Sequence, residues 1–306
     1  MYTEIIIAEK RSHILTSTLR SHGWVHLLPN IPDEKVESFS RVERLSSGRV
    51  IYMHVSSLGG KFPKIIVSVT HEGVLLQVER DEIIKRVRYM LRLDEDLQDF
   101  YALCKKKGRK WENLTEGRGY LLRSPEIFED LVKVICTTNI QWGGTKRMVK
   151  ELVNSFGAPF PGDPALFSFP APESISSISL EEFKDCVRLG YRAGYIYELC
   201  ARITSGGLKL NDLIHTSTPT AEIKKRLIAI KGVGNYAAAS MLMLLGRYDQ
   251  IPVDTVFRSF MKAKYFQDRQ FSEEAGLSIY DEWGQWKYLA YWNDMLAFYY
   301  PKAEIE

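Results

Sequence analysis

A short glycine-containing turn between two helix-like stretches constrains this fold more than any other feature of the chain. Lys231-Gly232-Val233-Gly234 separates two apolar-periodic segments and is followed by a run of small residues. Two glycines at this spacing suit a tight turn whose second glycine opens a helix, and such a helix start binds phosphate through its unpaired N–H groups. Many turns between helices use glycine for geometry alone, so a purely structural turn is the alternative.

A lone carboxylate follows one helix later. Asp254 lies in Pro252-Val253-Asp254-Thr255, at the expected start of the next helix. Aspartate is a preferred N-cap, so one interpretation is a structural cap. The other is an acid held near a phosphate-binding turn, as an enzyme that acts on a nucleic-acid backbone or base requires. The two features in this order are more specific than either one alone.

Several segments resemble one family in its motif order. Residues 227–258, LIAIKGVGNYAAASMLMLLGRYDQIPVDTVFR, closely resemble the helix-hairpin-helix (HhH-GPD) DNA glycosylases, in which a Gly/Pro-rich loop and an essential Asp follow the hairpin. Residues 118–157 look like the first core helices of the 8-oxoguanine and 3-methyladenine glycosylase branches. Residues 189–203 resemble the next signature helix, and residues 90–103 resemble the segment that joins the amino-terminal domain to the helical core.

The hydrophobic pattern predicts an α+β fold. Residues 1–80 are rich in β-branched and aromatic runs, and residues 64–79 are expected to form a β-hairpin. From Asp81 onward the apolar period is helical. Further helices are expected at 180–189, 194–205, 220–230, 236–245, 255–266 and 286–298. We therefore expect a small amino-terminal antiparallel β-sheet domain at 1–93, followed by a mostly α-helical core at 94–306 with its hairpin at 231–235, as the resemblance also implies.

Composition narrows the functional classes. The 306 residues are 45% hydrophobic and 26% charged, as in ordinary globular proteins, and the net charge of +3 is too small to indicate a polyanion partner by itself. No apolar run is long enough for a membrane span, and the start of the chain has no signal-peptide pattern. We expect a location in the cytoplasm, associated with the nucleoid, or in the nucleus of a eukaryote.

The cysteines give no indication of a metal site. The four cysteines have no CxxC or CxH spacing, so buried reduced thiols are expected. Some members of the resembled family carry an iron–sulfur cluster on four cysteines after the key Asp. No cysteine follows Cys200, so an iron–sulfur cluster is not expected, and neither is another cofactor. A monovalent cation at the hairpin, common in the family, is neither supported nor excluded by the sequence.

The resemblance implies removal of a damaged base from double-stranded DNA. Breaking an N-glycosidic bond passes through an oxocarbenium-like transition state, which nearby negative charge stabilises. We expect Asp254 to supply that charge and to position or deprotonate the attacking water. The residues expected to bind the DNA backbone at the hairpin are Lys231, Gly232, Val233, Gly234 and Asn235.

Tyr236 marks a departure from part of the family. Bifunctional members have a lysine there, which attacks the sugar and forms a Schiff base, but a phenol cannot form an imine. The resemblance thus implies a monofunctional hydrolase without lyase activity. Alkylated, 3-methyladenine-like purines suit it, because their ring charge lets them leave without protonation and aromatic side chains stack on cationic bases. The base-pocket candidates are Tyr236, Tyr291, Trp292 and Met295, although most aromatic residues near the carboxyl terminus are expected to be core.

A flipped base leaves a gap in the duplex that some side chain should fill. By resemblance Asn139, with Gln141 beside it, stands where the family places its gap-filling residue. Alternatively, Asn139 merely ends a helix. The position that reads the opposite cytosine in the oxoguanine branch falls at Gly144 rather than at an arginine, which weakens the oxoguanine interpretation.

Two other functions stay open. One is excision of an oxidised, 8-oxoguanine-like purine, and the other is a non-catalytic DNA-binding protein that uses the hairpin for grip alone. Because binding DNA alone requires no acid at this position, Asp254 favours an enzyme over a DNA-binding module. A monomer is expected, since one hairpin grips the duplex in the resembled family.

Overall fold

The computed structural model describes residues 1–33, 35, 37–59, 63–108, 110–111, 114, 117–213, 217–267 and 269–300. The chain forms two compact units, each built from two stretches of sequence. The first unit comprises Met1–Asp96 and Glu116–Leu210, and the second comprises Leu97–Thr115 and Asn211–Glu306. The expected domain boundary between residues 93 and 94 falls between two helices, Gln77–Leu91 and Gln98–Lys107, and it stays a prediction.

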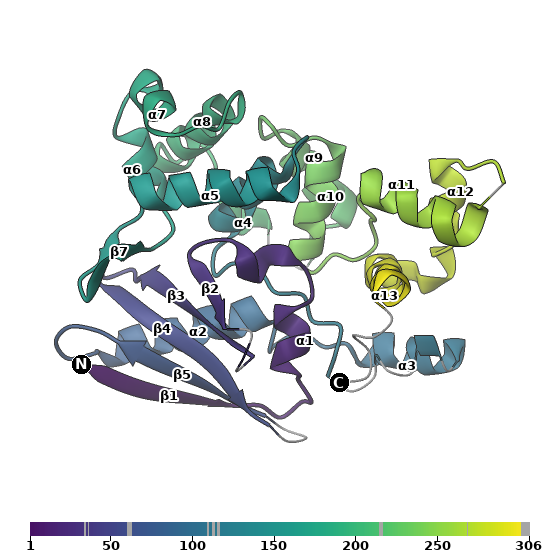
Figure 1. The fold of residues 1–306 in the computed structure, drawn as a ribbon, viewed down its shortest axis with the longest axis horizontal. Coiled ribbons are helices and arrows are strands. Elements are labelled where there is room, and N and C mark those ends of the chain that lie inside the picture. Colours follow the sequence, from purple (N-terminus) through teal and green to yellow (C-terminus); the bar gives the residue numbers. More distant parts are fainter. Residues whose placement is uncertain are drawn as a thin grey trace. The chain divides into compact units, whose positions relative to one another are not determined.

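A five-stranded antiparallel sheet forms the first part of unit 1 (Figure 1). Its strands are β1 (Tyr2–Ala8), β2 (Asn30–Asp33), β3 (Ser38–Arg44), β4 (Val50–Leu58) and β5 (Lys64–Thr70), in the spatial order β1-β5-β4-β3-β2. Alternate residues of β4 and β5 are fully buried, as expected for a sheet with one covered face. Helix α2 (Gln77–Leu91) crosses a face of this sheet. The predicted α+β class, with an amino-terminal antiparallel sheet before a helical core, is confirmed.

The predicted hairpin at residues 64–79 is wrong. Residues Val74–Leu76 have no strand structure, and α2 already begins at Gln77. Strand β5 has β1 on one side and β4 on the other, so neither of its edges is left for a following strand. The side chain of Glu79 accepts a hydrogen bond of 3.0 Å from the Leu76 N–H and closes the first turn of the helix instead.

The remaining elements of unit 1 are mostly helical. They are α1 (Leu15–Leu19), η1 (Gly23–His26), α4 (Ile127–Thr137), α5 (Trp142–Phe156), β6 (Pro159–Phe160), β7 (Asp163–Phe167), α6 (Pro172–Ser176), α7 (Leu180–Cys186) and α8 (Arg192–Thr204). In the proline-rich stretch after α5, β6 and β7 pair in a short two-stranded sheet.

Buried ion pairs join the sheet to α4. Arg41 of β3 has no exposed surface and binds Glu129 of α4, with 2.9 Å between Nη2 and Oε2. Lys133, one turn later, binds the other oxygen of Glu129 at 2.6 Å. Burial alone would raise the pKa of Glu129, but the charges of Arg41 and Lys133 lower it to about 2. This carboxylate is therefore ionised and fixes α4 against the sheet.

The described residues of unit 2 form helices joined by loops, and none of them lies in a strand. It contains α3 (Gln98–Lys107), α9 (Thr220–Ile228), α10 (Asn235–Leu244), α11 (Thr255–Met261), the π-helical turn η4 (Lys262–Phe266), α12 (Glu273–Ser278), η5 (Asp281–Trp286) and α13 (Lys287–Tyr299), while η3 (Leu210–Leu213) spans the junction between the units. The helices expected at 220–230, 236–245 and 286–298 are confirmed within two residues at each end. No helix among the described residues combines the length and apolarity needed to cross a bilayer.

Candidate active site

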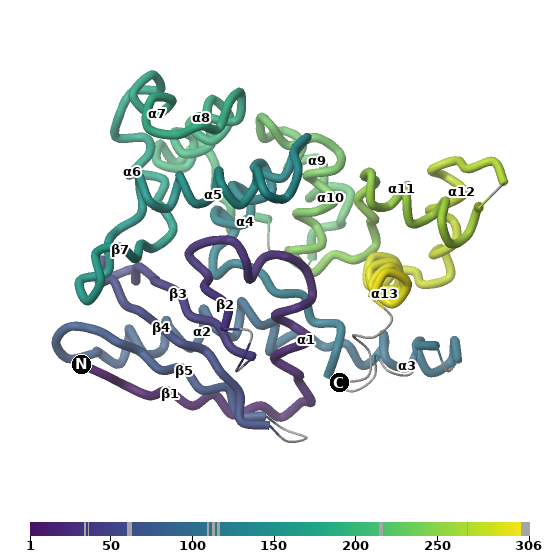
Figure 2. The backbone as a smooth tube through the Cα atoms, in the orientation of Figure 1, coloured from purple at the N-terminus to yellow at the C-terminus, as the bar shows by residue number. Residues whose placement is uncertain are grey.

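A hairpin of two helices opens the candidate site in unit 2 (Figure 2). Helices α9 and α10 pack together, and the chain between them turns at Gly232, whose φ is +88°. This left-handed conformation favours glycine. The N–H of Val233 donates to the Ile230 carbonyl at 3.0 Å, and both side chains are buried. Val233 thus anchors the turn in the core.

The start of α10 is open to solvent. Gly234 is its N-cap, with no side-chain cap, and an added Cβ there would meet no atom within 4 Å. Gly234 and its neighbours Lys231 and Asn235 are exposed. The helix therefore presents its first N–H groups and its positive dipole end to the surroundings, a geometry suited to an anion.

Asp254 is the N-cap of α11. Its Oδ1 accepts a hydrogen bond of 2.7 Å from the N–H of Phe257, so the capping interpretation is confirmed as a description of its local structure. Partial burial raises the pKa of Asp254, and this effect outweighs the opposing hydrogen bonds of the Phe257 and Val256 N–H groups and the charge of Arg258. The carboxylate thus lies in a partly dry environment, where its charge acts strongly.

Asp254 lies beside a group of tyrosines, Tyr236, Tyr288 and Tyr291, which we call the tyrosine cluster. The pKa of Tyr288 is raised well above its ordinary value, first by burial and then by the charges of Tyr291, Tyr236 and Asp254. Burial also raises the pKa of Tyr291, with Asp254 and Tyr236 as the next causes. These groups are therefore electrostatic neighbours, and the phenols of Tyr288 and Tyr291 are uncharged at neutral pH.

Helix α13 supplies one wall of this arrangement. Trp292 stacks on Tyr288 with 5.8 Å between ring centroids, and Tyr291 meets Phe257 of α11 edge-on at 5.4 Å. Met295 is buried one turn after Tyr291. The structure thus brings Asp254, Tyr236 and Tyr291 together, and the ring of Trp292 contacts both Tyr288 and Tyr291, the latter at 6.3 Å between centroids. Sequence reasoning did not select Tyr288, although its position three residues before Tyr291 places it on the same helical face.

Asn139 and Gln141 belong to unit 1. Asn139 follows the end of α4 with φ at +48°, and its side-chain amide donates to the hydroxyl of Tyr191 at 3.5 Å. Gln141 is the N-cap of α5, and both residues are exposed. The next residue, Trp142, has its indole ring only 2.4 Å from where a Cβ on Gly23 would stand. The absence of a side chain at Gly23 thus makes room for Trp142.

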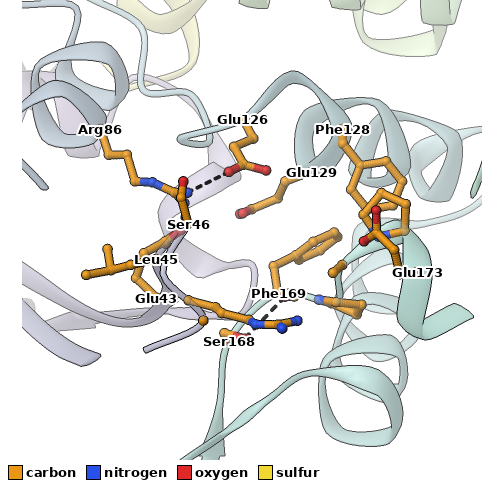
Figure 3. A pocket seen from close by; sticks show the side chains of 15 residues that line it. Glu43, Leu45, Ser46, Arg86, Glu126, Phe128, Glu129, Ser168, Phe169 and Glu173 are labelled. Atoms are coloured by element: carbon orange, nitrogen blue, oxygen red, sulfur yellow. Dashed lines mark hydrogen bonds and ion pairs between the residues drawn. The ribbon is translucent and has the colours of Figure 1, made fainter. Parts of the chain in front are cut away.

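A cavity of about 430 Å³ lies elsewhere in unit 1 (Figure 3). Arg86 forms ion pairs there with Glu43 and with Glu126, the latter at 2.8 Å. The rings of Phe128 and Phe169 also line the cavity. None of the residues predicted from the sequence to serve in binding or catalysis lines it. Among the described residues of both units, no group of His, Cys, Asp and Glu has the arrangement of a metal site.

Comparisons with known proteins agree with this geometry. A family model described as "HhH-GPD superfamily base excision DNA repair protein" matches residues 132–280. DNA-3-methyladenine glycosylase of Bacillus subtilis (strain 168) is 26% identical over 220 residues, which cover 69% of this chain and 70% of that protein.

Solved structures share the fold at lower identity. The 3-methyladenine DNA glycosylase from Archaeoglobus fulgidus is 18% identical with a TM-score of 0.72, and the match covers 97% of this chain and 99% of that one. The 8-oxoguanine glycosylase/lyase of Clostridium acetobutylicum, in complex with double-stranded DNA containing cytosine opposite to 8-oxoG, is 17% identical with a TM-score of 0.67, covering 96% and 98%. The hairpin and the acid after it both lie within the stretch matched by the family model, which assigns residues 132–280 to the HhH-GPD superfamily of base excision DNA repair proteins.

Proposed function

We propose that this protein is a DNA glycosylase that flips an alkylated, 3-methyladenine-like purine out of double-stranded DNA and hydrolyses its N-glycosidic bond. The observation that carries this proposal is the partly buried Asp254 carboxylate beside the tyrosine cluster, one helix after an open hairpin. A module that only grips DNA has no need of a carboxylate with a raised pKa in this position.

The acid acts on the sugar. As the bond from the anomeric carbon to the base nitrogen breaks, positive charge develops on the sugar ring, and the Asp254 carboxylate stabilises it. A water molecule, oriented or deprotonated by the same carboxylate, adds to the anomeric carbon. The base leaves with the bonding electron pair. Because Asp254 is partly desolvated, its electrostatic effect is larger than it would be in water.

The hairpin holds the DNA during this step. The first N–H groups of α10 bind a backbone phosphate, and the exposed ammonium of Lys231 adds a positive charge beside it. Gly232 and Val233 keep the turn in shape, while Asn235 lies at the surface that faces the strand. In unit 1, Asn139 and Gln141 enter the gap that the flipped base leaves.

A water-using mechanism follows from Tyr236. The residue lies in the first turn of α10, beside Asp254 and the other tyrosines, and its phenol cannot form an imine with the sugar. The enzyme is therefore monofunctional, and it releases the base without cutting the strand.

Uncharged phenols suit a positively charged base. The partly exposed rings of Tyr236 and Trp292 offer electron-rich faces, which attract a cationic alkylated purine more than a neutral one, while Tyr291 is almost completely buried. Such a purine also leaves without protonation, so one carboxylate suffices. Met295 completes the apolar lining of the base pocket.

A second substrate class has its own support. The fold is also close to that of an 8-oxoguanine glycosylase/lyase, with a TM-score of 0.67 against 0.72 for the 3-methyladenine enzyme, so excision of an oxidised purine is the competing function. Oxidised purines are neutral and leave less readily, which makes protonation or a stronger nucleophile necessary. The aromatic surroundings of Asp254 favour the alkylated class.

A panel of duplexes tests the function. Each duplex carries one lesion, alkylated or oxidised, and is incubated with the protein, and strand scission is measured with and without alkali. We expect scission of the alkylated duplex only after alkali. Release of the oxidised base alone would assign the competing function. If the protein shifts the duplexes in a gel but releases no base from any of them, and Asp254→Asn binds DNA equally well, the protein is a DNA-binding module and not an enzyme.

A further inference from the structure

A second carboxylate of unit 2 is saturated with donors and lies outside the proposed mechanism. The side chain of Asp294, on α13, has no exposed surface. Its Oδ1 forms ion pairs with Lys264 at 2.6 Å and with Lys110. Its Oδ2 accepts hydrogen bonds from the hydroxyls of Tyr280, at 2.9 Å, and Tyr265. Donors from three separate segments therefore converge on one carboxylate.

This group of side chains carries one positive charge in excess. Two ammonium groups oppose a single carboxylate. Burial and the charge of Asp294 raise the pKa of both Tyr265 and Tyr280, so the phenols contribute no charge. Among the described residues, neither Lys110 nor Lys264 pairs with any other carboxylate.

The two ammonium groups are close enough to disturb each other. Burial lowers the pKa of Lys264, and the Lys110 ammonium lowers it further against the opposing effect of Asp294. Two like charges held together by one buried carboxylate are repulsive, and an anion that bridges them would relieve the repulsion. Elsewhere in unit 2, Lys287 pairs with exposed Asp281 at 2.6 Å in a simple one-to-one ion pair.

Solvent reaches this pair of lysines. The side chain of Lys110 is 49% exposed and that of Lys264 is 20% exposed. Rings surround the ammonium groups, with Trp111 at 4.8 Å from Lys110 and Phe260 and Phe298 at 5.4 and 5.7 Å from Lys264. The ring faces and Asp294 hold both lysines in place, so a ligand meets preorganised charges.

We propose that Lys110 and Lys264 form a binding site for a phosphate-type oxyanion, with Asp294 as the residue that positions them. Such an anion offers several acceptor oxygens to two ammonium groups and cancels the excess charge. A DNA backbone phosphate and inorganic phosphate share this chemistry. Only the assignment to DNA rests on the proposed function, whereas the site itself does not.

Inorganic phosphate tests the site directly. The full chain is melted in phosphate and in chloride at equal ionic strength, as wild type, Lys110→Met, Lys264→Met and the control Lys287→Met. We expect saturating phosphate to raise the Tm of wild type and Lys287→Met by roughly 2–4 °C. The shift should be clearly smaller in Lys110→Met, which retains the phosphate-binding start of α10, leaves Asp294 paired with Lys264 and so keeps the fold. Lys110→Arg should restore it.

The salt dependence of duplex binding identifies the source of the anion. An undamaged duplex is used, so that the result does not depend on glycosylase activity. If a backbone phosphate is the ligand, Lys110→Met should reduce the slope of log K against log salt by about 0.9, and Lys287→Met should not. A Tm effect without a change in slope would assign the site to free phosphate. If Lys110→Met changes neither quantity relative to wild type, the site does not exist.

Discussion

The carboxylate of Asp254 lies close enough to Tyr291 for its charge to raise the pKa of the phenol. One residue starts α11 and the other belongs to α13, so the contact between these helices decides the surroundings of the acid. The same carboxylate caps its own helix through the Phe257 N–H. A single side chain therefore has a structural and a chemical role, and substitutions can separate the two.

Asp254→Asn should separate them. Asparagine is as good an N-cap as aspartate, so the free energy of unfolding should change by less than about 1 kcal/mol. Loss of the negative charge should slow base release on the order of 10²-fold or more. Single-turnover excision and thermal melting measure the two effects, with Asp281→Asn as an exposed-acid control. Near-native excision by Asp254→Asn would remove the residue from the mechanism.

The pH dependence should follow the raised pKa of Asp254. The carboxylate takes up a proton at a higher pH than an ordinary aspartate, whose pKa is about 3.9, so excision should fall on acidification with a midpoint above that value. Single-turnover rates from neutral pH into the acid range measure this, with an enzyme-free duplex to correct for spontaneous loss of bases. A midpoint at or below the ordinary value would mean that the acid is not desolvated during catalysis.

The same shift has a consequence for stability. A raised pKa in the folded state means that the folded chain holds this proton more tightly than the unfolded chain does. This bound proton stabilises the folded state fully at pH values below the pKa that Asp254 has in the unfolded chain. The contribution is lost as the pH rises through the pKa that Asp254 has in the folded chain. Asp254→Asn should therefore reduce the difference in unfolding free energy between mildly acidic and neutral solutions, as measured by denaturant titration. An unchanged difference would show that other groups account for it.

Borohydride should trap no covalent complex. With Tyr236 in α10 there is no amine at the position that attacks the sugar in bifunctional relatives, so no imine forms to be reduced. Incubation of the protein with its lesion duplex and borohydride, followed by denaturing electrophoresis, measures this. A strong adduct would show lyase chemistry, and its loss in Lys231→Met would identify the amine.

The two glycines of the hairpin should respond differently to alanine. At Gly232, with φ at +88°, alanine should destabilise the fold by roughly 1–2 kcal/mol and weaken binding to DNA. At Gly234 the backbone is extended and nothing would touch a new Cβ, so the effect on stability should be smaller. Denaturant titration and duplex binding compare them. Equal losses at both positions would contradict the structural difference between the glycines.

Periodic features of the sequence were the predictable ones. The helices around the hairpin show a clear apolar period, and their observed ends differ from the expected ones by two residues at most. The capping position of Asp254 was also evident, because the acid precedes a Thr-Val-Phe run. The second strand of the hairpin expected at residues 64–79 is absent for a non-local reason. Strand β5 pairs with β4 on one side and with β1, from the start of the chain, on the other. It therefore has no free edge with which a following strand could pair.

The lysine pair at Asp294 could not be found from the sequence. Its donors come from the segment after α3, from the π-helical turn and from the residue before η5, and no spacing connects these segments. Tyr288 differs from this case, because helical spacing from Tyr291 and Trp292 places it on their face. What remained unpredictable were contacts between elements that are distant in sequence.

The buried group of Arg41, Glu43, Glu129 and Lys133 has an evolutionary consequence. Losing any one member leaves an unbalanced charge in the interior, which typically costs several kcal/mol, whereas exchanging the whole group for hydrocarbon side chains is often close to neutral. Divergent sequences should therefore keep the set intact or abandon it as a whole, so that the sheet and the helix it anchors are inherited as one block.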